Sequence, residues 1–241
     1  MKQFQSKFKQ SARQLSLAGL VLAAATLRVG AQSVWSGAGP DANWSDAANW
    51  VGATAPVAGN TLDFTGNANT SPNNDFTADT AFGGLLFDAN AATFTLTGNE
   101  ITLSGLVEND ATNTLQTITL PLLISTPVTF NTVSNDLSGS GYSNNILVGL
   151  PSGGISGAGS LIKMGPGSLE ISNKTYSGGT TISNGLLIVD NDNGSYTLSG
   201  GSLLLTYGSW YSSPTFTFTA NSWLGVQAGG PDYTSRGRYD F

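Results

Sequence analysis

The sequence predicts an all-β protein built as a right-handed β-solenoid, a stack of short strands wound around one core. Three observations favour this class. The chain has 31 glycines and 9 prolines in 241 residues, which disfavours long helices. Short segments that alternate polar and apolar residues recur, each bounded by glycine, asparagine or serine. Small phrases also repeat, as expected when each coil of a stack returns to the same corner.

The first element, residues 1–31, has the pattern of a secretory signal and is expected to be helical. Its first 28 positions hold five basic residues, which are Lys2, Lys7, Lys9, Arg13 and Arg28. The apolar run from Leu15 to Leu27 is shorter than the ~20 residues of a membrane-spanning helix. Small residues follow at Val29, Gly30 and Ala31, where a signal peptidase needs them. We therefore predict export and cleavage after Ala31.

The rest of the chain is acidic and has few charges. After residue 31 the chain has 15 acidic residues and only four basic ones. The basic residues are Lys163, Lys174, Arg236 and Arg238. This balance disfavours binding to nucleic acid or to anionic lipid. The sequence contains no Cys and no His, which excludes Ser-His-Asp and Cys-His catalysis and the common zinc sites. We expect no catalytic residues, no metal and no cofactor.

The predicted strands begin with residues 93–97 and 100–104, which alternate polar and apolar residues and end at Gly98 and Gly105. Later segments of the same kind are 161–163, 168–171, 180–182, 186–189, 196–198 and 202–205. Strands of this length fit either a β-sandwich or a stacked solenoid.

Repeated phrases favour the solenoid over the sandwich. Thr-Leu-Ser-Gly occurs at 102–105 and again at 197–200, with a variant at 136–139. A Gly-x-Leu unit begins at Gly159, Gly167, Gly185 and Gly201. A solenoid needs a residue that tolerates positive φ near each strand start, and glycine supplies it.

Residues 157–189 carry a spaced pattern of Gly, Leu, Lys and Tyr. The positions are Gly157, Gly159, Leu161, Lys163, Gly165, Gly167, Leu169, Tyr176, Gly178, Thr180, Ile182, Gly185, Leu187 and Val189. This pattern resembles the autotransporter-associated β-strand repeat, also called the passenger-associated transport repeat. The sequence departs from the family once, because the segment before Tyr176 is one residue short and Lys174 stands where Asn is expected. The resemblance implies a passenger-type solenoid at the surface of a Gram-negative-type bacterium.

The segment before the repeat is rich in tryptophan. Trp35, Trp44 and Trp50 stand in the order W-x-G, N-W-S and N-W, similar to the segment that precedes such repeats in large secreted bacterial proteins. We expect these rings to cap the first coil, because a stack cannot leave its end bare. A stacking platform for sugars, and hence a carbohydrate-binding module, is the alternative use of the three rings.

These assignments divide the chain into five parts. Residues 1–31 are the signal, 32–80 the capping segment, 81–150 the start of the solenoid and 151–210 the repeat region. Residues 211–241 form a tail that supplies neither further repeats nor a translocator barrel. We expect such parts to lie beyond a truncated end.

One candidate site carries a weaker pattern. Residues 190–194 read Asp-Asn-Asp-Asn-Gly, similar to a calcium loop, but the Gly is fifth and no bidentate Glu follows. A β-turn is the preferred interpretation. A polysaccharide-degrading enzyme is a third function class, which the absence of an evident carboxylate pair disfavours. The expected function is adhesin-like, with extracellular polysaccharide or a host or matrix surface as the partner.

The alternation within the repeat predicts which side chains face the core. These are Leu161, Leu169, Ile171, Ile182, Leu187 and Val189. Ser168 is expected to be exposed, and the Tyr176 hydroxyl to reach solvent or a corner carbonyl. Corner positions where a Cβ would clash are expected at Gly165, Gly167, Gly178 and Gly185.

Overall fold

The computed structural model describes residues 31–112, 114–133, 146–149, 153–190, 194–200, 202–207, 215–219, 222–227 and 237–240. The predicted signal lies outside these ranges apart from Ala31, as do residues 136–139 and residues 191–193 of the calcium-like loop. The described residues form a row of short strands with one 3-10 turn, η1 (Ala47–Asn49). None of their helical turns is long and apolar enough to cross a membrane.

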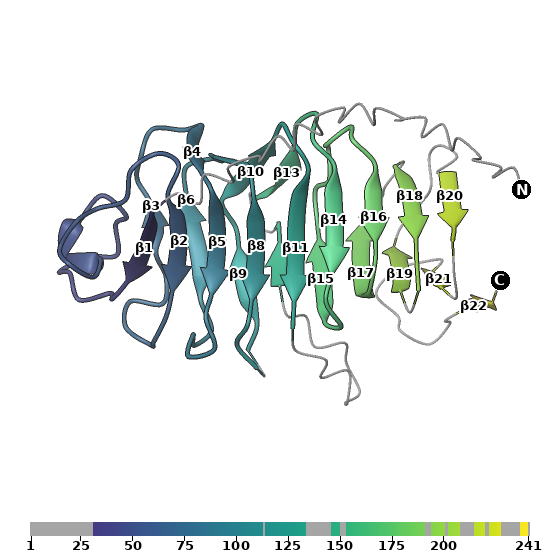
Figure 1. The fold of residues 1–241 in the computed structure, drawn as a ribbon, viewed down its shortest axis with the longest axis horizontal. Helices are drawn as coiled ribbons and strands as arrows, with labels where there is room; N and C mark the ends of the chain where they lie inside the picture. The colour runs from purple at the N-terminus through teal and green to yellow at the C-terminus, as the bar shows by residue number, and fades with distance from the viewer. Residues whose placement is uncertain are drawn as a thin grey trace, which may run out of the picture.

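Two long sheets run side by side along the molecule (Figure 1). Sheet 1 contains, in spatial order, β1 (Gln32–Trp35), β2 (Thr61–Phe64), β5 (Gly84–Phe87), β8 (Leu106–Asn109), β11 (Val128–Thr132), β14 (Leu161–Met164), β16 (Thr180–Ile182), β18 (Ser195–Leu198) and β20 (Thr215–Phe218). Sheet 2 contains β3 (Asn73–Asn74), β6 (Thr95–Gly98), β9 (Gln116–Ile118), β12 (Ile146–Val148), β15 (Ser168–Ile171), β17 (Gly185–Asp190), β19 (Ser202–Tyr207), β21 (Trp223–Gln227) and β22 (Gly237–Asp240).

A shorter sheet 3 closes one side of the early coils. It contains β4 (Thr80–Phe82), β7 (Ile101–Leu103), β10 (Pro121–Ile124) and β13 (Gly154–Ser156). Leu85 of one coil pairs with Val107 of the next, 22 positions later, and Lys163 pairs with Ile182, 19 positions later. Coils become shorter after β15 because β16 follows it with no sheet 3 strand between them.

The strand pairing identifies the fold as a β-solenoid. Within the described residues, every strand pairs in parallel with strands of the neighbouring coils, except β22, which is antiparallel to β21. Parallel pairing between equivalent positions of successive coils is the geometry of a stacked solenoid, and a sandwich would pair its strands antiparallel. The prediction of an all-β, solenoid-type stack is confirmed. Strands β20 and β21, from the region predicted as a tail, extend sheets 1 and 2.

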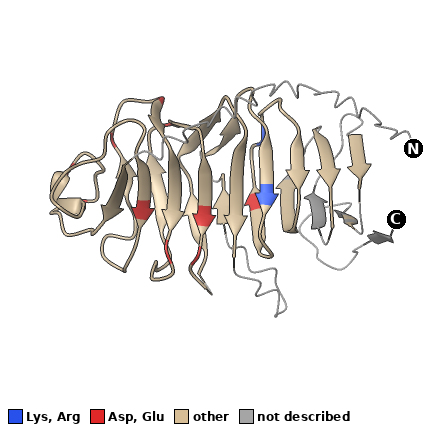
Figure 2. Cartoon of the chain, viewed as in Figure 1, with Lys and Arg blue, Asp and Glu red and all other residues tan. Residues whose placement is uncertain are grey.

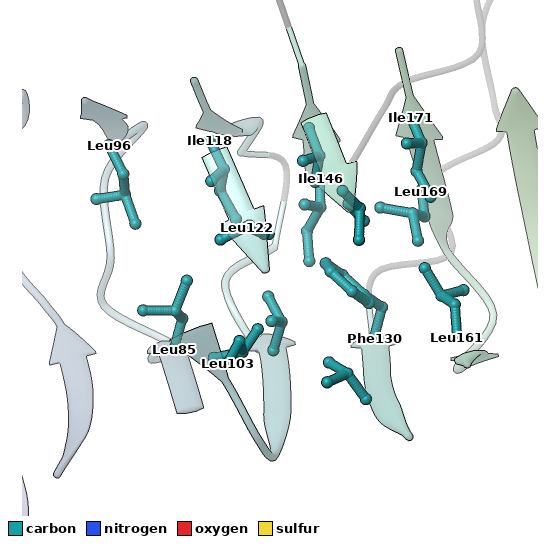
Figure 3. Packing of buried hydrophobic residues seen from close by; sticks show 14 of the residues in the cluster. Leu85, Leu96, Leu103, Ile118, Leu122, Phe130, Ile146, Leu161, Leu169 and Ile171 are labelled. Atoms are coloured by element: carbon teal, nitrogen blue, oxygen red, sulfur yellow. The ribbon is translucent and has the colours of Figure 1, made fainter. Parts of the chain in front are cut away.

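Alternate residues of each strand form the core between the sheets. Leu62, Leu85, Val107 and Phe130 are successive partners along sheet 1, and all four are fully buried. Figure 3 shows side chains from several strands pointing into the space that the sheets enclose. The six side chains of the repeat predicted to face inward are likewise buried at 0% exposure, which confirms their assignment. Burial of each such apolar side chain stabilises the folded chain by roughly 1.5–3 kcal/mol.

The predicted exposure of Ser168 is wrong, because the residue is fully buried. Ser168 pairs with Leu186 in register, and Leu186 is also buried although it does not belong to the main core cluster. Ile188, two positions further along the same strand, is buried in the same way. The outer face of β15 and β17 is therefore covered at these three positions, whereas strict alternation would leave them in solvent.

The recurring Ser and Thr at strand ends have a common role. The amide N and the Oγ of Ser104 both donate to the carbonyl oxygen of Phe82, at 3.3 and 3.4 Å. Ser199 donates to Ile182 in the same way, at 2.9 and 3.3 Å. Both serines are the third residue of the Thr-Leu-Ser-Gly phrase. Four threonines form equivalent pairs of bonds with the preceding coil. They are Thr97, Thr119, Thr175 and Thr219.

The glycines of the repeat lie at corners. Gly165 and Gly185 have φ of +74° and +75°, a backbone region that favours glycine. A Cβ on Gly178 would lie 2.3 Å from the carbonyl oxygen of Gly159. These three positions agree with the predicted corners.

Candidate functional site

The three tryptophans form a buried cluster at the N-terminal end. Trp35 and Trp44 are fully buried and Trp50 is 2% exposed. The Trp35 and Trp50 rings meet edge to face, with centroids 5.1 Å apart. Trp44 packs against Phe64 and Phe82 at 5.8 and 5.7 Å. The rings extend the solenoid core into the end of the stack, as the capping interpretation expects, and none presents an open face on which a sugar could stack.

Asparagine side chains hold the loop that crosses this end. The Asn49 Nδ2 donates to the carbonyl oxygens of Asp41 and Asn43 at 3.1 and 3.0 Å, and its Oδ1 accepts from the Gly39 amide at 2.9 Å. Asn69 donates to the carbonyl of Gly37 at 2.9 Å. These bonds satisfy loop backbone groups that no strand can pair. Asn49 is the Asn of the N-W phrase in the sequence, whereas no sequence pattern indicates Asn69.

A buried carboxylate lies next to the first strand. Asp63 of β2 is 7% exposed, and its Oδ2 accepts a hydrogen bond of 2.8 Å from the Nε2 of Gln32. Its Oδ1 has no hydrogen-bond partner among the described residues. Burial, together with the Asp88 and Asp110 carboxylates, raises the pKa of Asp63 to about 6. The sequence offered no indication of this site, because 31 positions separate the two partners.

Lys163, predicted only as a position of the repeat, is the one fully buried lysine among the described residues. It stands in register between Phe130 and Ile182, both of which face the core. Its Nζ donates to the carbonyl oxygens of Met164, Gly165 and Asn184 at 2.6, 2.9 and 3.4 Å. Burial lowers the pKa of Lys163 to about 7. The Lys163 ammonium thus donates to three backbone carbonyl oxygens that lie close together at one corner of the coil.

Tyr176 differs from the prediction made for its hydroxyl. The side chain is 4% exposed, and its Oη shares a hydrogen bond of 2.7 Å with the Oγ1 of Thr180. The Lys174 Nζ lies 4.2 Å from the centre of the Tyr176 ring, a cation–π geometry. Lys174 also forms a parallel bridge with Ile155, which joins it to the previous coil.

The outer face of sheet 1 carries a column of hydroxyl side chains. Thr181, Thr197 and Thr217 are successive partners in β16, β18 and β20. Charged residues occupy few segments of the ribbon, and most of it carries neither sign (Figure 2). The described residues contain no group of three or more acidic side chains placed to hold a metal ion. The outer surface is therefore suited to hydrogen bonding more than to ion pairing.

No protein-family model, curated protein or solved structure matches this chain.

Proposed function

We propose that this chain is an exported, non-catalytic passenger-type β-solenoid, presented at or beyond the outer membrane of a Gram-negative-type bacterium. The observation that carries the proposal is the parallel stack of strands in residues 157–189, where the sequence resembles the autotransporter-associated β-strand repeat. The basic and apolar segments of residues 1–31 support export. The absence of Cys and His from the sequence supports a binding role over catalysis.

The proposed partner is extracellular polysaccharide or a host or matrix surface. The outer column of Thr181, Thr197 and Thr217 supplies hydroxyl groups at the regular spacing of a sheet, about 4.8 Å between strands. A polymer with repeated hydroxyl groups presents hydrogen-bonding partners at comparable intervals. The buried tryptophans argue against the alternative module that would stack sugars on Trp35, Trp44 and Trp50.

Fractionation of cells expressing the full chain tests the export proposal. The chain should be found in the periplasm, outer membrane or medium, and Val21→Arg, which breaks the apolar run, should retain it in the cytoplasm. A native chain that stays in the cytoplasm would contradict export.

Adhesion is tested separately on purified protein. Retention on polysaccharide- or matrix-coated surfaces should decrease for Thr197→Glu, and Val57→Glu is the control because Val57 is 65% exposed near the opposite end of the stack. Equal retention of both variants and the native chain would contradict a role for the hydroxyl column.

A further inference from the structure

The first strand begins where the predicted signal ends. Gln32 is the first residue of β1, and it is exposed. Ala31 immediately precedes it, and its carbonyl oxygen accepts a hydrogen bond of 3.1 Å from the Thr61 amide. Cleavage after Ala31, on which this inference rests together with the proposed export, would make Gln32 the N-terminal residue of the mature chain.

An N-terminal glutamine can close on itself. The α-amine nitrogen bonds to the side-chain Cδ, the bond from Cδ to Nε2 breaks, and ammonia leaves with Nε2 and one proton from the amine. The product is a five-membered lactam with no free α-amine. The reaction needs no oxidant or further reactant, but it requires the Cδ atom to approach the nitrogen of its own residue.

In the structure the Gln32 side chain is held by a residue of the neighbouring strand. Its Nε2, the atom that would leave, donates to the Oδ2 of Asp63 at 2.8 Å. Asp63 lies on β2, and neighbouring strands are about 4.8 Å apart, so the side chain reaches across to the next strand. Closure of the ring would first have to break this bond.

Asp63 has a strong requirement for the same donor. The carboxylate is buried, and its other oxygen has no partner among the described residues. Asp88 and Asp110 add negative charge nearby. Loss of a donor leaves a buried acceptor unsatisfied, which costs more than a typical hydrogen bond contributes. The lactam no longer carries the side-chain NH₂ group that makes this bond.

We propose that Gln32 can cyclise once it is the N-terminal residue and that its bond to Asp63 slows this reaction, so that the folded mature chain keeps an open glutamine with a free α-amine for longer than the unfolded chain does. The protection belongs to the folded state, because Gln32 and Asp63 are 31 positions apart and meet only through the pairing of β1 with β2.

The test uses residues 32–241, released from a fusion by a protease that leaves Gln32 first. Loss of ammonia is followed by intact mass, and the free α-amine by N-terminal sequencing. The native chain should cyclise more slowly in buffer than in urea. Asp63→Ala should accelerate cyclisation in buffer by roughly two- to tenfold, the range that corresponds to one net hydrogen bond. Asp63→Asn, which keeps a carbonyl acceptor, should remain near the native rate.

Glu108→Ala is the matched control, because Glu108 lies on sheet 1 two strands away and bonds to Asn131. It should not change the rate, and all chains should cyclise alike in urea. Equal rates for the native chain in buffer and in urea would overturn the proposal, and that comparison does not depend on the folding of any variant. Since the protease creates the Gln32 terminus, a failure of export in cells would leave this result unchanged.

Discussion

The Nζ of Lys163 donates to the carbonyl oxygen of Asn184 at 3.4 Å, and this bond joins two successive coils from inside the stack. The same Nζ donates to two carbonyls of its own coil. A buried ammonium with three backbone acceptors replaces an apolar side chain in a column that contains Phe130 and Ile182. Three backbone carbonyl oxygens at this corner thereby gain a donor. The Lys163 ammonium loses its contact with water in return, which costs free energy.

The first prediction concerns the pH dependence that Lys163 creates. Its pKa is lowered from about 10.5 to about 7 by burial, so between these values the unfolded chain holds more protons than the folded one. Stability should therefore rise with pH between 7 and 9, by up to about 1.4 kcal/mol per pH unit. Urea melts at each pH measure the free energy of unfolding and hence this rise. Lys163→Met should abolish the rise, and an unchanged slope in this variant would contradict the assignment.

The second prediction concerns Asp63, for which the dependence of stability on pH has the opposite sign. Burial raises its pKa from 3.8 to about 6, so between these values the folded chain holds more protons and stability should fall as pH rises. Asp63→Asn keeps an acceptor for Gln32 and removes the charge. At pH 7 it should be more stable than the native chain by roughly 1–3 kcal/mol in urea melts. A less stable variant at pH 7 would show that the charge is needed.

The third prediction concerns the hydroxyl bonds between coils. The Thr119 Oγ1 donates to the carbonyl of Leu96 at 2.9 Å. Thr119→Val keeps the shape and removes the donor, which should lower the free energy of unfolding by about 0.5–1.5 kcal/mol. Thr117→Val, on the outer face of the preceding strand, should change it by less than about 0.5 kcal/mol. Thermal melts of both variants compare the two, and equal effects would remove the role given to Thr119.

The fourth prediction concerns the core. Leu169 is fully buried, so Leu169→Asp should lower the free energy of unfolding by more than about 3 kcal/mol. Met164→Asp is the control, since Met164 is 45% exposed on the preceding strand β14 and should tolerate the change within about 0.5 kcal/mol. Similar urea midpoints for both variants would contradict the inward assignment of Leu169.

Local alternation was sufficient to predict β6, β7, the strands from β14 to β19 and the six inward-facing side chains of the repeat. Leu161, Ile182 and Val189 could be assigned to the interior because period 2 is a property of the strand itself. The same rule failed at Ser168, because the covering of an outer face depends on what packs there. The bond from Lys163 to Asn184 and the contact between Gln32 and Asp63 depend on register between coils, which a single sequence does not specify.

We propose that this solenoid is exported and that its mature chain starts at the first strand. N-terminal sequencing of the protein recovered from the periplasm or culture medium tests both statements. This material should begin at Gln32, the first residue of β1. Exported material that begins at Met1 would contradict it.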